Sequence, residues 1–136
     1  MTALLVALQW LHVLFATAWL GSQIYLDTTV HRAVDNLPPE PRAAVNADLG
    51  TGRARRITLA IVTGTIVFGF LRGALGGVLS ELGTLYGLTW LLALALGTFM
   101  MLSVWTRGFR GRVRNPAWNA FFVVQFTLMI LMRFGY

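Results

Sequence analysis

The stretch LHVLFATAWLG, from Leu11 to Gly21, lies at the centre of the first apolar segment of the chain, about residues 2–29. A helix of roughly 20 residues, rising about 1.5 Å per residue, crosses the hydrocarbon core of a bilayer, so this segment is long enough to span a membrane. It carries a histidine, His12, near its middle. An ionisable side chain at that depth is costly in lipid and normally faces protein, a partner or a cofactor. The stretch therefore predicts a membrane helix with a buried, functional histidine.

The composition favours an integral membrane protein with a single domain. Of the 136 residues, 57% are hydrophobic and 12% are charged, whereas soluble domains carry about twice that share of charge. Eleven arginines and no lysine give a net charge of +6. These arginines flank apolar segments, where they set topology and meet lipid headgroups, so we expect no nucleic-acid binding. The absence of cysteine excludes disulfides, iron–sulfur clusters and covalently attached haem.

The chain order predicts an all-α, four-helix membrane bundle with up-down topology that occupies residues 1–136 as one transmembrane domain. The first apolar segment lacks a basic leader and exceeds the usual signal-peptide core, so we expect it to be retained. A polar cytoplasmic loop over residues 31–56, with one short helix near 42–49, follows it. The four predicted spans are about residues 2–29, 57–77, 84–106 and 117–136.

Arginine counts predict the orientation in the membrane. Most arginines lie in the loop 31–56 and in the connection 107–116, and only Arg72 and Arg133 lie at the other ends of the spans. By the positive-inside rule, both basic loops are cytoplasmic and both termini face outward. We therefore expect a multi-pass protein of the inner, or plasma, membrane.

Two helix faces are predicted to turn inward. At i, i+3 and i+4 spacing, one face of the first helix combines polar, aromatic and small residues: Gln9, His12, Ala16, Trp19 and Gln23. In the second segment, glycines at every fourth position, Gly69, Gly73 and Gly77, predict that another backbone approaches closely there.

The histidines suggest a haem site, with alternatives. His12 is predicted either to ligate a haem b iron or to be a neutral imidazole hydrogen-bonded within the bundle, to Gln125 or to a threonine. One buried histidine per chain leaves the sixth ligand open among water, methionine, another donor, or the same histidine of a second subunit. His31 lies beside Arg32 at the cytoplasmic edge, and it is interpreted as a solvated interfacial residue or as a further metal ligand.

Other residues qualify as partners of such a cofactor. Met129 and Met132 lie near the depth of His12 and offer thioether donors to haem iron or to Cu(I). Arg72 and Arg133 end the two helices that rise on the outer side, where they would pair with haem propionates or reach the membrane interface.

Three short motifs resemble a known superfamily. LHVLFATAWLGSQIYL begins at Leu11, ARRITLAIVTGT at Ala54 and GTLYGLTWLLALALG at Gly83. They are similar to the small membrane proteins that include the copper-resistance D domain and the HemJ-type protoporphyrinogen oxidase. The matching positions are His12, Trp19 with Gly21, Arg56, Thr63 with Gly64, and Tyr86 with Gly87.

The resemblance implies a four-helix, often dimeric protein in which haem b is bound by the first-helix histidine, here His12. The HemJ-type enzymes are expected to carry a lysine shortly after the Y-G pair of the third helix, and this chain has no lysine. The resemblance therefore implies haem binding more directly than protoporphyrinogen oxidation.

These observations leave three hypotheses. The leading one is a homodimeric b-type haem protein for electron transfer, redox catalysis or small-gas binding, with an unidentified redox partner; as an enzyme it would be a haem-dependent oxidoreductase. The first alternative is copper or other metal uptake without haem, using His12, Met129 and Met132. The second is a structural bundle that dimerises through its glycine stripe.

Overall fold

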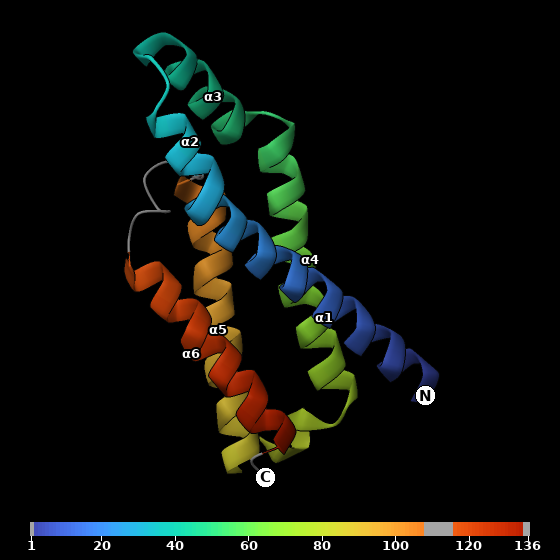
Figure 1. Cartoon of the computed structure of the whole chain (residues 1–136). Helices are drawn as coiled ribbons and strands as arrows, with labels where there is room; N and C mark the ends of the chain where they lie inside the picture. Colours follow the sequence, from blue (N-terminus) through green and yellow to red (C-terminus); the bar gives the residue numbers. More distant parts are fainter. Residues whose placement is uncertain (1, 108–115, 135–136) are drawn as a thin grey trace.

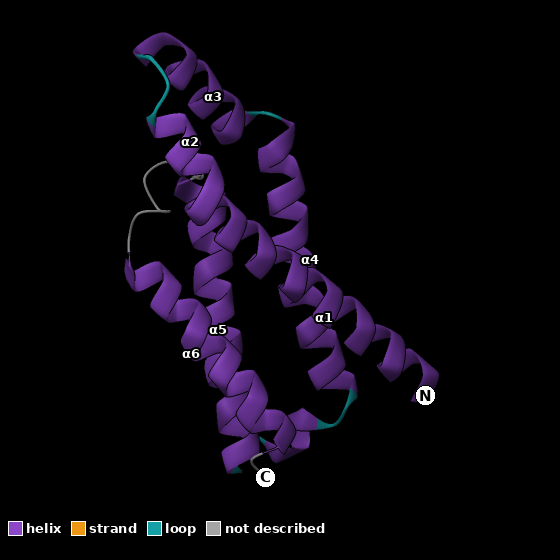
Figure 2. Cartoon of the chain, in the orientation of Figure 1, coloured by secondary structure: helices purple, strands orange, loops and turns teal. Residues whose placement is uncertain are grey.

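The chain folds as an all-α protein, as predicted. The computed structural model describes residues 2–107 and 116–134, and these contain helices and no strand (Figures 1 and 2). The elements in order are α1 (Thr2–Tyr25), the π-helical turn η1 (Leu26–Val30), α2 (His31–Asp35), α3 (Pro39–Thr51), α4 (Arg53–Leu75), the 3-10 turn η2 (Val78–Glu81), α5 (Leu85–Arg107) and α6 (Pro116–Phe134).

Three helical stretches are long and apolar enough to cross a membrane: Thr2–Asp35, Pro39–Leu75 and Leu85–Thr106. The fourth predicted span corresponds to α6, whose apolar part within the described residues is the shorter stretch Ala120–Arg133. Large apolar side chains point outward along these helices, as in Trp10, which is 72% exposed, and Val123, which is 66% exposed. Such a surface is suited to lipid contact.

The segment predicted as a polar loop over residues 31–56 is mostly helical, which corrects that prediction. The first helix continues through η1 and α2 to Asp35, and α4 begins at Arg53, earlier than residue 57. The short helix expected near residues 42–49 is present but longer, because Pro39 occupies its first turn, where the missing N–H costs nothing. Arg42 Nη2 donates to the backbone oxygens of Asp35, at 2.6 Å, and Leu37, at 2.8 Å, which ties α3 to the end of α2.

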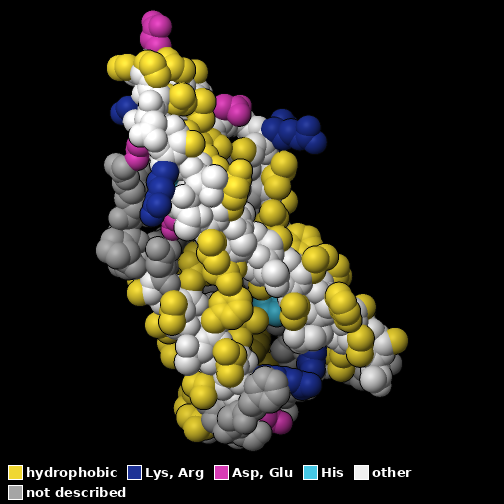
Figure 3. Space-filling model, in the orientation of Figure 1, with side chains coloured by type: hydrophobic (Ala, Val, Ile, Leu, Met, Phe, Trp, Pro, Cys, Tyr) yellow, Lys and Arg dark blue, Asp and Glu magenta, His cyan; other side chains and the backbone are white. Residues whose placement is uncertain are grey.

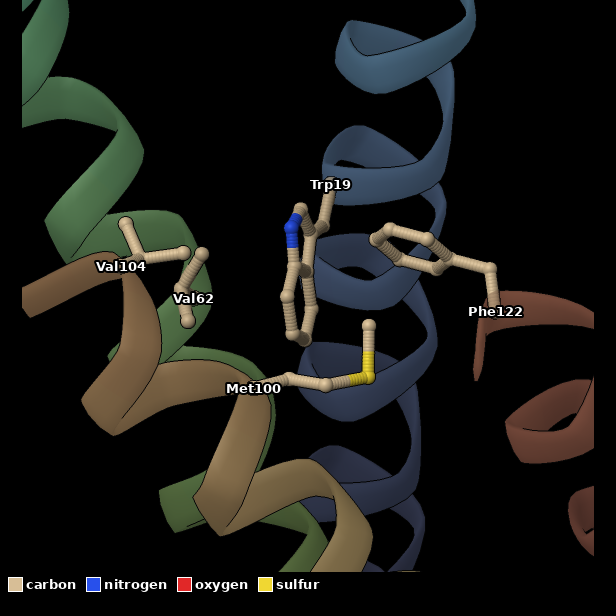
Figure 4. Close-up of a cluster of buried hydrophobic side chains, with 5 residues drawn as sticks. All are labelled: Trp19, Val62, Met100, Val104 and Phe122. Carbon is tan, nitrogen blue, oxygen red and sulfur yellow. The ribbon is translucent and has the colours of Figure 1, made fainter. Parts of the chain in front are cut away.

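The helices pack in the order α1, α4, α5, α6, and α3 packs on α4. In Figure 1, α1 crosses α4 at an angle, and its N-terminal half diverges from α6, while both chain ends lie toward the same end of the molecule. The four long helices meet in one cluster of buried side chains, Trp19, Val62, Met100, Val104 and Phe122 (Figure 4). Trp19 and Phe122 form an edge-on pair with ring centroids 5.0 Å apart. This cluster closes the gap between α1 and α6 at mid-height, and the gap widens from there toward the termini.

Candidate cofactor cavity

A cavity of about 610 Å³ lies between the diverging helices α1 and α6. This volume is within the range of about 300–1,000 Å³ found for small-molecule and cofactor sites. Figure 3 shows a hollow on this face with a histidine side chain inside it and arginine side chains beside it. Its lining includes polar, aromatic, small and thioether residues: Gln9, His12, Trp19, Thr65, Gly69, Arg72, Gly73, Tyr86, Trp90, Phe122, Gln125, Met129, Met132 and Arg133. All four long helices therefore contribute to one cavity.

His12 lies in the wall of this cavity with one ring nitrogen anchored. Its Nδ1–H donates to the backbone oxygen of Thr65 in α4, at 2.8 Å. A carbonyl oxygen only accepts, so the bond places the proton on Nδ1 and leaves a lone pair on Nε2 in the neutral ring. Nε2 has no hydrogen bond to the described part of the chain. This is the arrangement typical of metal-bound histidines, in which one nitrogen is held by a backbone carbonyl and the other binds the metal.

The ring of His12 is held close to α4 because residue 69 has no side chain. A Cβ atom at that position would lie 2.7 Å from Cε1 and 2.8 Å from Nδ1 of His12. Residues 65 and 69 are one turn apart, so a ring resting on Gly69 can reach the carbonyl oxygen of Thr65. Gly69 thus leaves space for the imidazole ring, and the backbone oxygen of Thr65 fixes its orientation.

The predicted inward face of α1 is confirmed for its three later members: Ala16, Trp19 and Gln23 are buried. His12 is partly buried, and Gln9 is exposed overall but lines the cavity. The face thus begins in the cavity and continues into the core.

The glycine stripe serves a different purpose from the predicted one. Side chains of the same chain, and not a second backbone, lie against Gly69 and Gly73: His12 covers the first, and Trp90 of α5 the second. A Cβ atom at residue 73 would overlap the Trp90 indole. Gly77 lies outside the helix, in a left-handed conformation with φ +94° that opens the turn into η2. Gly69 and Gly73 therefore face the inside of the bundle, whereas Gly77 is exposed in the turn.

The two predicted propionate partners, Arg72 and Arg133, both line the cavity. They lie in the last turns of α4 and α6, at the end of the cavity nearest the chain termini. Nε of Arg72 is buried, and it has no hydrogen-bond partner in the described structure. A buried, unpaired guanidinium nitrogen is costly, and it fits a site that receives an anionic group.

The methionines divide between cavity and core. Met129 and Met132 line the cavity together with His12. Met100 is completely buried in the core cluster. The two thioethers that the sequence assigned to the depth of His12 are therefore the ones available to a bound metal or cofactor.

His31 does not line the cavity, which begins on the opposite side of Trp19. It is the first residue of α2, and its Nε2 is buried without a partner among the described residues. No group of three or more His, Cys, Asp or Glu side chains able to hold a metal occurs in residues 2–107 and 116–134. His31 and His12 therefore belong to separate environments, as their spacing predicted.

Several cavity residues were missed in the sequence. Thr65, Trp90 and Tyr86 lie in its wall. Gln125, which was predicted beside a threonine as a partner of His12, also lines the cavity, but its Nε2 donates to the backbone oxygen of Ala93, at 3.1 Å, and its Oε1 is buried without a described partner. The glycine spacing was the available signal for Trp90, because a glycine on a helix face marks where a large side chain from another helix can fit.

The chain was also compared with known proteins. No protein-family model matches it, and no significant match was found to a curated protein or to a solved structure.

Proposed function

We propose that this protein is a membrane-embedded b-type haem protein in which His12 Nε2 ligates the iron. The observation that carries the proposal is the anchored imidazole. Its Nδ1–H is bound to Thr65, and its ring lies in the wall of a cavity of about 610 Å³ lined by four helices. The second nitrogen then carries the lone pair that a ferrous or ferric iron requires.

The other cavity residues fit the edges of such a cofactor. Arg72 and Arg133, at the terminal end of the cavity, would bind the propionate carboxylates. The aromatic walls, which include Trp90 and Phe122, suit an apolar macrocycle. Met129 and Met132 are the thioether donors available for a sixth position. When bound, haem would supply an iron that changes oxidation state or binds a small gas, and in an enzyme it would support oxidoreductase chemistry.

The surroundings of the bundle are proposed to be a bilayer. Three helical stretches have the required length and hydropathy, and the exposed surface is rich in large apolar side chains. With the arginine-rich segments in the cytoplasm, the termini and the cavity mouth lie on the outer side of the plasma membrane. The resemblance of the three motifs further implies a homodimer.

The test of the haem proposal is an absorption spectrum of detergent-purified protein, oxidised and dithionite-reduced, with a pyridine haemochrome assay to count haem per chain. We expect a Soret band and b-type reduced bands in the native protein. His12→Gly should lose the haem while the helical circular dichroism stays unchanged, and added imidazole should restore the Soret band. His31→Ala is the matched control and should retain its haem. Full haem retention in His12→Gly without imidazole would refute the assignment.

Copper uptake is the second candidate, because His12, Met129 and Met132 share one cavity. A soft thioether and imidazole set suits Cu(I). This candidate predicts a colourless protein that binds Cu(I) with a stoichiometry that falls when Met129 and Met132 are both replaced by leucine. A Soret band in the native protein, with Cu(I) binding unaffected by these replacements, would decide for haem.

A further inference from the structure

Three buried polar atoms on one face of the continuous helical stretch Thr2–Asp35, which comprises α1, η1 and α2, have no hydrogen-bond partner in the described structure. They are Nε1 of Trp19, Oδ1 of Asp27 and Nε2 of His31. Between the first two lies Gln23, whose side chain is only 4% exposed. We use the name polar track for four residues that are spaced four positions apart in this stretch: Trp19, Gln23, Asp27 and His31.

The π-helical turn keeps the polar track on one face. In a regular α-helix a four-residue step drifts by about 40°, so four residues in such a row would wind away from the core. Asp27 lies within the turn η1, Leu26–Val30, and His31 follows it directly; the wider turn of a π-helix reduces this drift. Irregular π-turns within helices frequently mark functional positions. Here the turn brings a carboxylate and an imidazole onto the face that already carries Trp19 and Gln23.

Trp19 connects the polar track to the cavity. Trp19 is 4% exposed and lines the cavity. In Figure 4 its six-membered ring points toward Met100, and its indole nitrogen lies at the edge of the ring that faces Val62 and Val104. Trp19 therefore belongs both to the cavity wall and to the polar track, and its Nε1 is the unpartnered polar atom of the track nearest the cavity.

Buried donors and acceptors without protein partners are rare, since each costs on the order of 1–3 kcal/mol. Ordered water is the usual partner, and a buried water typically makes about three hydrogen bonds. The polar track supplies an N–H donor, an amide, a carboxylate and an imidazole, and these groups hydrogen-bond to water. From Trp19 to His31 they extend over about 18 Å of helix. At the far end, the neighbouring Thr28, Thr29 and Arg32 are exposed.

We infer that the polar track lines a file of water molecules that admits water and small cations, protons included, from the α2 end of the bundle to the wall of the cavity. Asp27 and His31 lie at the outer end of this path, and Gln23 and Trp19 orient the water at its inner end. The inference goes beyond the proposed function and does not depend on a bound haem. It assigns a role to the residues that follow Trp19 on this face, which do not line the cavity.

The chain has no native cysteine, so single cysteines can report water access directly. Gln23→Cys and Asp27→Cys are reconstituted in liposomes and treated with Ag⁺, and the remaining free thiol is measured by maleimide labelling and mass spectrometry. The matched control is Ile24→Cys, which is next to Gln23 in the chain but on an exposed apolar face, with Ile24 53% exposed. Because ions are excluded from hydrocarbon, we expect the two track cysteines to react at least about tenfold faster than the control. Equal or slower reaction of both would overturn the inference.

A second pair of variants tests the direction of access. In the Gln23→Cys background, Asp27→Leu fills the outer stretch with an apolar side chain, whereas Asp27→Asn keeps its size and polarity. We expect Asp27→Leu to slow the silver reaction at residue 23 at least about tenfold and Asp27→Asn to leave it nearly unchanged. Identical rates would show that the path does not pass Asp27. Since the readout is thiol modification, the result is independent of whether the preparation contains haem.

Discussion

The imidazole of His12 rests on Gly69, close enough that a Cβ atom at residue 69 would lie 2.7 Å from Cε1 of the ring. This contact joins α1 to α4 in the wall of the cavity. Any side chain at residue 69 must move the ring away from the carbonyl oxygen of Thr65, to which Nδ1 donates. The position of the candidate ligand therefore depends on a residue that carries no side chain.

The first prediction concerns Gly69→Ala. The added methyl group should displace His12 and lengthen its bond to Thr65, and loss of such an orienting bond typically lowers metal affinity by about 10–100-fold. We expect a haem content well below that of the native protein, measured as the ratio of Soret to protein absorbance after purification. The helical content should stay near the native value, because alanine is the better helix former.

Gly21→Ala is the control for this prediction. A Cβ atom at residue 21 would meet nothing within 4 Å, so this variant should retain its haem. Equal haem retention in the two variants would mean that the His12 ring does not pack against Gly69 in the functional protein.

The sequence predicted the face of α1 that turns inward, and it named Gln125 or a threonine as partner of His12, but it did not predict that the contact is with the backbone oxygen of Thr65. Helical periodicity is a local property, so the spacing of His12, Ala16, Trp19 and Gln23 was sufficient to group them. The partner of His12 is a backbone carbonyl 53 residues away in the chain. A backbone acceptor leaves no trace in residue identity, so only the crossing of α1 and α4 could reveal it.

The second prediction concerns Arg72→Gln. If Arg72 binds a propionate, its replacement removes a charge-assisted hydrogen bond, which contributes about 1.5–3 kcal/mol. We therefore expect haem to dissociate at least about tenfold faster, measured by transfer to apomyoglobin. Arg32→Gln is the control, because Arg32 is exposed at the other end of the molecule. Similar dissociation rates in both variants would exclude Arg72 from the propionate site.

The segment between the first two long helices shows a second limit of the sequence. Prolines, acids and glycines predicted a loop with a short helix, whereas α3 extends over Pro39–Thr51. A proline at the first helical position is compatible with a helix, and the link from Arg42 to Asp35 and Leu37 stabilises the preceding turn. These are contacts across a turn, which hydropathy does not report.

The third prediction concerns Gly73→Ala, in the same stripe as Gly69. Residue 73 is buried, and a Cβ atom there would overlap the indole of Trp90. Overpacking of this kind costs about 1–3 kcal/mol. We expect a lower midpoint of thermal unfolding in detergent, followed by circular dichroism. The control is Gly83→Ala, where a Cβ atom would meet nothing within 4 Å; an unchanged midpoint in Gly73→Ala would show that Trp90 does not pack there.

The fourth prediction concerns Met100, which is completely buried where the four long helices meet. Met100→Ala leaves a cavity next to Trp19 and should lower the free energy of unfolding by about 2–5 kcal/mol. Leu102→Ala is the matched control two residues on: Leu102 is 53% exposed, and lipid would replace its contacts at little cost, because acyl chains are as apolar as leucine. Both variants can be followed by SDS titration of the helical signal in mixed micelles. If both lose the same stability, the packing of α5 against Trp19 is not the centre of the fold, and the separation of α1 from α6 that forms the cavity must depend on other contacts.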